Sequence, residues 1–135
     1  MKVLVDTSIW SMALRRRPSP EEQTVAELTG LIRDGRVQII GPIRQEILSG
    51  VRHEQQFERL KRRLDSFPNM PIETEDYVTA AQFFNQCRAR GVQGSNTDFL
   101  ICAVSVRLSA AIFTSDQDFD HFAAHLPISV HRGTA

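Results

Sequence analysis

The sequence has few cysteines and no long apolar run, and each absence excludes a class of protein. Its two cysteines, Cys87 and Cys102, belong to no CxxC pair of the kind that binds zinc or exchanges disulfides. We therefore expect both thiols to be reduced and packed. No apolar run approaches the roughly 20 residues that cross a bilayer, and no basic-then-apolar leader begins the chain. A cytoplasmic protein with no membrane segment is expected.

Net charge and two common ligand-binding motifs are also missing. Sixteen Lys and Arg balance sixteen Asp and Glu, so a nucleic acid would have to be attracted by a local basic patch. The stretch "DTSIWS" has no glycine after the first predicted strand, which excludes the GxGxxG turn of dinucleotide-binding domains. His121 and His125 have the i, i+4 spacing of zinc ligands, but the HExxH pattern is absent and zinc binding is not expected.

What the chain does contain is an alternation of strand and helix patterns. Hydrophobic residues make up 41% of the 135 positions, enough for one core, so residues 1–135 are expected to form a single domain. The alternation predicts an α/β fold with a mostly parallel central sheet of about five short strands, flanked by helices. Strands are predicted at residues 2–5, 36–40, 70–72, 110–114 and 128–132, and helices at 7–14, 20–34, 41–51, 53–67, 74–90, 95–108 and 115–122.

Capping signals place several helix starts. Ser19, Pro20 and Glu22 predict a capping box for the second helix, and Thr74 is expected to cap the helix at 74–90. Trp10, the only tryptophan, is expected to pack in the core or in a dimer interface.

Four acidic residues fall where a parallel sheet would gather them. Ligands of open α/β sheets bind beyond the carboxyl ends of the strands. Asp6 directly follows "VLV", and Asp116 follows "AAIFTS". Asp98 enters from the first turn of the helix that Ser95 begins, and Glu46 from the helix at 41–51. We therefore expect the four carboxylates to face one cleft.

Each acid also has an ordinary structural explanation. Asp6 could cap the first helix, Asp98 and Asp118 could complete capping boxes in "SNTD" and "SDQD", and Glu46 could be helix surface. Together these explanations weaken, because carboxylates about 5 Å apart repel by roughly 1 to 3 kcal/mol per pair at an effective dielectric of about 20 to 80. A divalent cation removes that repulsion.

Ligands that offer only oxygen favour Mg²⁺ or Mn²⁺, ions that commonly meet substrate phosphates. Such ions generate hydroxide from bound water and stabilise the leaving oxygen in an in-line displacement, which predicts phosphate-ester chemistry. The hydroxyls of Thr7, Ser8 and Thr114 are expected to orient carboxylates or ion-bound waters.

In this order, the stretches around the acids resemble the PIN-domain ribonucleases and, within them, the VapC toxins of bacterial type II toxin–antitoxin modules. "LVDTSIW" is similar to the family's first strand and acid, "GPIRQEILSG" to its second-acid helix, "GSNTDFLICAVS" to its third and "IFTSDQDF" to its fourth. The resemblance covers the whole chain. It implies a PIN-like fold in which Asp6, Glu46, Asp98 and Asp116 hold Mg²⁺ or Mn²⁺ for endonucleolytic cleavage of RNA. Asp118 is the second candidate for the fourth acid, after Asp116.

The resemblance further implies a homodimer and a cognate VapB-type antitoxin whose C-terminal segment covers the active-site groove. Arg15, Arg16 and Arg17 follow the first helix and would contact RNA near the rim, although a solvated loop explains them equally well.

Two alternative functions stay open. Phosphatases of the haloacid dehalogenase type also begin with a strand that ends in Asp and use Mg²⁺, but they should carry a second Asp two residues on, where this chain has Ser8. A PIN-like binding module without catalytic activity would keep the fold, and the presence of all four acids argues against it.

Overall fold

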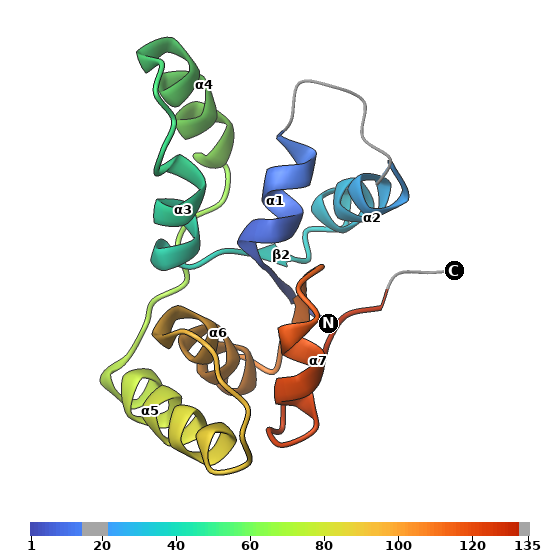
Figure 1. The fold of residues 1–135 in the computed structure, drawn as a ribbon. Coiled ribbons are helices and arrows are strands. Elements are labelled where there is room, and N and C mark those ends of the chain that lie inside the picture. Colours follow the sequence, from blue (N-terminus) through green and yellow to red (C-terminus); the bar gives the residue numbers. More distant parts are fainter. Residues whose placement is uncertain (15–21, 133–135) are drawn as a thin grey trace.

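A three-stranded parallel sheet, in the order β2-β1-β3, lies at the centre of the fold (Figure 1). The computed structural model describes residues 1–14 and 22–132. The central strand β1 (Val3–Val5) pairs on one side with β2 (Val37–Gln38) and on the other with β3 (Ala111–Phe113). The residues of β1 are all buried, as expected for a central parallel strand covered on both faces. The carboxyl ends of the strands therefore meet at one edge of the sheet.

Helices cover both faces of this sheet. Figure 1 shows α5 and α6 side by side below the sheet, α1 and α2 above it, and α3 with α4 at the upper left. No helix in the described ranges is long and apolar enough to span a bilayer. The helices are α1 (Thr7–Ala13), α2 (Glu22–Arg33), α3 (Gly41–Leu48), α4 (Glu54–Leu64), α5 (Thr74–Arg88), α6 (Asn96–Arg107) and α7 (Asp118–Ala123).

The sheet has three strands where five were predicted, because at each edge the pairing continues only as a single parallel bridge. Ile39 bridges to Asn69 at one edge, and Ile112 bridges to Val130 at the other. The prediction of a strand at residues 70–72 is wrong, and that at 128–132 is reduced to the bridge at Val130. At the first edge Pro71 has no N–H with which to extend the ladder beyond Asn69.

One helix cap also differs from the prediction. Thr74 is the first helical residue of α5, and the N-cap position belongs to Glu73. The backbone N–H of Glu73 donates to Asp76 Oδ2 at 2.9 Å, so a capping box is present and the cap lies one residue earlier than predicted. Ser19 and Pro20, predicted to begin α2, lie outside the described residues.

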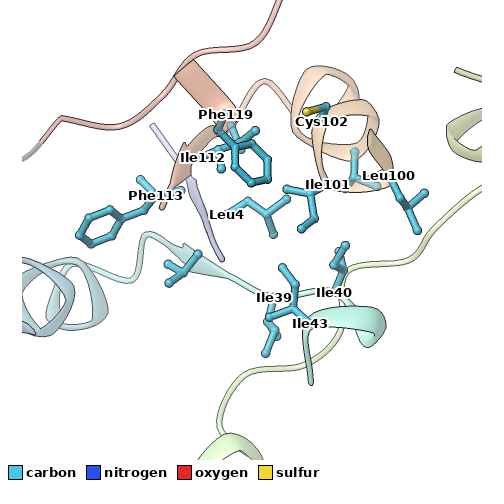
Figure 2. Close-up of a cluster of buried hydrophobic side chains, with 14 of the residues drawn as sticks. Leu4, Ile39, Ile40, Ile43, Leu100, Ile101, Cys102, Ile112, Phe113 and Phe119 are labelled. Carbon is cyan, nitrogen blue, oxygen red and sulfur yellow. The ribbon is translucent and has the colours of Figure 1, made fainter. Parts of the chain in front are cut away.

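The core joins the sheet to its helices. Figure 2 shows Leu4 of β1 at the centre of a cluster of buried side chains that includes Ile101 of α6 and Ile112 of β3. Trp10 is also buried, and its indole N–H donates to the carbonyl of Val5 at 3.1 Å, which fixes α1 against the end of β1. Full burial of each large apolar side chain contributes roughly 1.5–3 kcal/mol. Cys87 and Cys102 are both free and buried, as predicted.

An ion pair between the buried Asp76 and the partly exposed Arg107 holds the end of α6 against the start of α5. Arg107 Nε donates to Asp76 Oδ1 at 2.8 Å, and Arg107 Nη2 donates to the carbonyl of Pro71 at 2.7 Å. Asp76 is only 2% exposed. Burial raises the pKa of Asp76, but the hydrogen bonds from Arg107 and from the Glu73 backbone outweigh burial and hold this pKa below its ordinary value.

Replacing Asp76 with Asn should lower the urea midpoint of unfolding at pH 7, because Arg107 loses its anionic partner. The pKa of Asp76 is lower in the folded chain than in the unfolded one, so its contribution is complete above the unfolded value of about 3.9 and is lost as pH falls through the folded value. The difference between wild type and Asp76→Asn should therefore shrink at pH 3.

The matched control is Asp120→Asn. It removes an exposed ion pair in which Arg132 Nη2 lies 2.6 Å from Asp120 Oδ1. Exposed pairs contribute little, so this variant should unfold almost as wild type does. Equal losses in the two variants would contradict a special role for the Asp76–Arg107 pair.

Candidate active site

Asp6 lies where β1 ends, and its carboxylate is committed to hydroxyl groups. It occupies the N-cap position of α1, yet its side chain makes no capping hydrogen bond, so the interpretation of the carboxylate as a cap is wrong. Asp6 Oδ2 instead accepts hydrogen bonds from Thr114 Oγ1 at 2.8 Å and from Ser8 Oγ at 3.1 Å. The residue is only 8% exposed, and a charge at that depth needs such partners.

The segment after β3 is tied to the same place. Besides donating to Asp6, Thr114 Oγ1 accepts the backbone N–H of Asp116 at 3.0 Å, and Ser8 Oγ accepts that of Ser115 at 3.1 Å. These bonds link the ends of two neighbouring strands through side chains. They also hold Asp116 at the edge of the sheet where Asp6 lies.

Asp118 does not form the capping box that "SDQD" suggested. Helix α7 begins at Asp118, with Gln117 at its N-cap, so Asp118 lies inside the first turn. Its backbone N–H donates to Asp116 Oδ1 at 2.9 Å. Because an Asp side chain that binds a backbone N–H two residues ahead forms a local turn, Asp118 helps to orient the Asp116 carboxylate.

Asp98 and Glu46 reach the site from α6 and α3. Asp98 completes the predicted capping box: its N–H donates to Ser95 Oγ and its Oδ2 accepts the N–H of Ser95, both at 3.1 Å. Glu46 Oε2 accepts a hydrogen bond from Thr7 Oγ1 at 3.3 Å. The hydroxyl of Thr7 therefore binds Glu46. The hydroxyls of Ser8 and Thr114 bind Asp6 instead.

The four carboxylates influence one another electrostatically. Burial and then the charge of Asp6 raise the pKa of Glu46, the Thr7 hydrogen bond opposes them, and Asp98 adds a smaller increase. Burial raises the pKa of Asp98, the bonds to Ser95 oppose it, and Asp6 and Asp116 raise it further. Mutual repulsion of this kind requires that the charges lie near one another. The predicted acids thus belong to one anionic cluster at the carboxyl edge of the sheet.

The donor chemistry of this cluster fits a hard cation. It offers oxygen alone, and its charges disfavour one another's ionised forms, a penalty that a divalent ion would relieve. The side chains do not already form a ligand shell: within residues 1–14 and 22–132, no three Asp, Glu, His or Cys side chains lie close enough together to hold an ion. Occupation by a metal would therefore require side-chain adjustment.

The predicted RNA-binding arginines and one unpredicted contact complete the comparison of the site with the sequence. Arg15, Arg16 and Arg17 lie outside the described residues. Ser115 was not singled out from the sequence, although its N–H fixes the Ser8 hydroxyl. No local pattern predicts that bond, because it joins residues 107 positions apart.

Comparison with known proteins agrees with this architecture. The family model of the PIN domain matches residues 3–125. The chain belongs to the PIN-domain family. This PIN domain is 31% identical over 123 residues to "VapC ribonuclease Mb1587" of Mycobacterium bovis and to "Ribonuclease VapC11" of Mycobacterium tuberculosis, covering 90% of this chain and 91% of each relative. The resemblance to VapC proteins is thereby confirmed.

Solved structures share the fold. FitAcB from Neisseria gonorrhoeae matches with a TM-score of 0.75 and 22% identity, covering 96% of both chains. VapBC2 from Rickettsia felis, solved with a DNA fragment from its promoter, matches with a TM-score of 0.72 and 15% identity over the full length of both chains. The PIN-like α/β fold with a parallel sheet flanked by helices is confirmed.

The electrostatic coupling of the acids can be measured directly. Replacing Asp6 with Asn should lower the pKa of both Glu46 and Asp98, because one source of repulsion disappears. Carboxyl ¹³C NMR titration of the metal-free protein in EDTA measures both values. Asp34→Asn, at an exposed position after α2, is the control and should leave them unchanged. Unmoved titrations in Asp6→Asn would show that the acids do not form one cluster.

Proposed function

We propose that this chain is a Mg²⁺- or Mn²⁺-dependent endoribonuclease and the toxin component of a VapBC-type toxin–antitoxin module. Residues 1–135 would act as a single PIN domain. The proposal is supported by the electrostatic influence that Asp6, Glu46, Asp98 and Asp116 have on one another, in a chain whose relatives are named VapC ribonucleases. That cluster combines the charge and the oxygen ligands that RNA phosphodiester hydrolysis uses.

Under this proposal the four acids hold the ion. When bound, the ion would supply a hydroxide nucleophile and stabilise the charge that develops on the leaving oxygen. Thr114 and Ser8 fix the Asp6 carboxylate, and Thr7 orients Glu46. Since the pKa of Glu46 and that of Asp98 are raised, protons compete with the cation, and metal affinity should fall as pH falls.

The proposal includes two kinds of partner besides the metal. Arg15, Arg16 and Arg17 would bind phosphates of the RNA, supported by the sequence alone: three adjacent cations in a chain of zero net charge. A VapB-type antitoxin would cover the site in a complex of toxin homodimers. The names of the structural neighbours reported above, FitAcB and VapBC2, support an antitoxin. Co-purification with the product of a small adjacent antitoxin gene tests it.

Cleavage of single-stranded RNA tests the activity. Wild type should cut RNA with Mg²⁺ or Mn²⁺ and lose activity in EDTA. Asp6→Asn and Asp98→Asn should each lower the rate by about two orders of magnitude or more, as when one group is removed from a preorganised electrostatic site. The exposed control Asp34→Asn should cleave as wild type does. At limiting metal, the rate should rise from pH 5 to pH 7.

The outcomes separate the alternatives. Cleavage that needs no metal, or full activity in both acid variants, would overturn the four-acid mechanism. Hydrolysis of a small phosphate monoester without cleavage of RNA would favour the haloacid dehalogenase type of phosphatase. RNA binding without cleavage under every metal condition would favour a binding module.

The hydroxyl of Thr114, which joins the ends of β1 and β3, should affect the rate of RNA cleavage. Thr114→Val keeps the side-chain shape but removes both the donor to Asp6 and the acceptor for the Asp116 N–H. We expect kcat to fall roughly 10- to 100-fold, the usual cost of losing a group that orients a metal ligand. Thr114→Ser retains the hydroxyl and should keep most of the activity. Equal kcat in Val and Ser variants of similar melting temperature would exclude this role.

A further inference from the structure

A small cavity opens where α5 ends and α6 begins, next to the turn of α6 that carries Asp98. Its volume is about 270 Å³. Phe99, in its wall, directly follows Asp98, and Gly94 directly precedes Ser95, to which Asp98 is hydrogen-bonded. The cavity and a proposed metal ligand therefore share one turn of α6. The lining residues, none of which belongs to the acid cluster, are Phe84, Arg88, Val92, Gln93, Gly94 and Phe99.

The topology places the start of α6, and with it one wall of the cavity, toward the carboxyl edge of the sheet. Helix α6 leads into β3, which runs parallel to β1, so α6 begins at the edge where both strands end. Helix α5 packs along α6, and Figure 1 shows the two side by side with a short connection between them. Gly94, which directly precedes the α6 N-cap residue Ser95, therefore lies toward the same edge as Asp6 and Asp116.

The walls of the cavity are held by backbone bonds and by packing. Gly91 has a φ of +75° and ends α5, and the N–H of Val92 returns to the carbonyl of Cys87 at 2.9 Å, a bond that fixes the turn. A Cβ at Gly94 would lie 2.5 Å from Phe122 Cζ and 3.1 Å from Phe99 Cε2. The chain therefore passes directly against these rings, and the cavity is formed before any ligand arrives.

The lining has the chemistry that recognises an unpaired base. The half-buried ring of Phe84 packs edge-to-face with Phe99, with centroids 5.5 Å apart. Arg88 and Gln93 are exposed at the rim, and Arg88 forms no ion pair with any residue in the described part of the chain. Single-stranded RNA is bound by stacking on aromatic rings and guanidinium planes, with polar groups contacting the base edges. The volume, just below the usual range of about 300–1,000 Å³ for ligand sites, suits one base.

We propose that this cavity binds one nucleobase of the RNA substrate next to the bond that is cut, and so sets the base preference at that position. Phe84 stacks on the base, Arg88 covers it from the rim, and Gln93 contacts its polar edge. The inference rests on the proposed ribonuclease function for its substrate. Binding of free nucleotides, however, tests the cavity without any cleavage.

The direct test is a ¹H–¹⁵N NMR titration of the metal-free protein with each of the four ribonucleoside 5′-monophosphates in EDTA. At least one should shift the amides of Val92, Gln93 and Gly94 in a saturable way. Phe84→Leu and Arg88→Gln should each weaken this binding about tenfold, the size expected for loss of a stacking partner. Phe84→Tyr keeps the ring and should bind as wild type does.

Arg90→Gln is the matched control for Arg88→Gln, because Arg90 is also exposed near the end of α5 but does not line the cavity. In RNA cleavage, Arg88→Gln and Phe84→Leu should raise KM and flatten the base preference at the cut site. Arg88 is exposed, so its variant tests the proposal even if Phe84→Leu folds poorly.

The two proposals fail in different ways. If no nucleotide shifts the amides of residues 92–94 at millimolar concentration, or if Arg88→Gln binds and cleaves as Arg90→Gln does, the cavity proposal is overturned while the ribonuclease stands. If nucleotides bind here in the expected way but wild type cleaves no RNA under any metal condition, the proposed activity fails and the base-binding site is retained.

Discussion

The buried carboxylate of Asp6, held by the hydroxyl of Thr114, is the contact on which the architecture of the site depends. It joins the carboxyl ends of β1 and β3, and it adds to the short ladder of these two strands and to the hydrogen bond between Ser8 and the Ser115 backbone. A buried negative charge is costly unless hydrogen bonds satisfy it, so the sheet must present hydroxyls at that point. The same hydroxyl then positions the backbone of Asp116. One side chain thereby fixes the spacing of two acids that are 110 residues apart in the chain.

The sequence predicted the order of the elements well because that order depends on local signals. Hydrophobic periodicity located the strands and helices, and the position of an acid directly after a strand placed Asp6 and Asp116 at one edge. The cap at Ser95 was equally local, since its partner Asp98 is three residues away. Such features need no knowledge of how distant segments pack.

What the sequence did not predict depends on long-range contacts. The α5 cap lies at Glu73, and its partner Asp76 also pairs with Arg107, 31 residues away, a contact that no local pattern predicts. Likewise, the Ser8 and Thr7 hydroxyls were expected to serve the acids together, but only the fold shows that Thr7 turns to Glu46. Gly94 lies against Phe122 with no room for a side chain, and no local pattern predicts that contact. Hydrophobic periodicity and helix-capping rules do not predict contacts between residues that are far apart in the sequence.

The single bridges that end the sheet have a consequence for how this protein associates with others. An exposed strand edge offers unpaired N–H and C=O groups along its length, and another chain can add to it as a further strand. Here each edge closes on one bridging residue, at Asn69 and at Val130, and Pro71 breaks the pattern beyond the first. Little template is left for strand addition or for aggregation through the sheet. Stable contacts with another polypeptide are therefore expected to use helix surfaces, where side chains rather than backbone decide which partner fits.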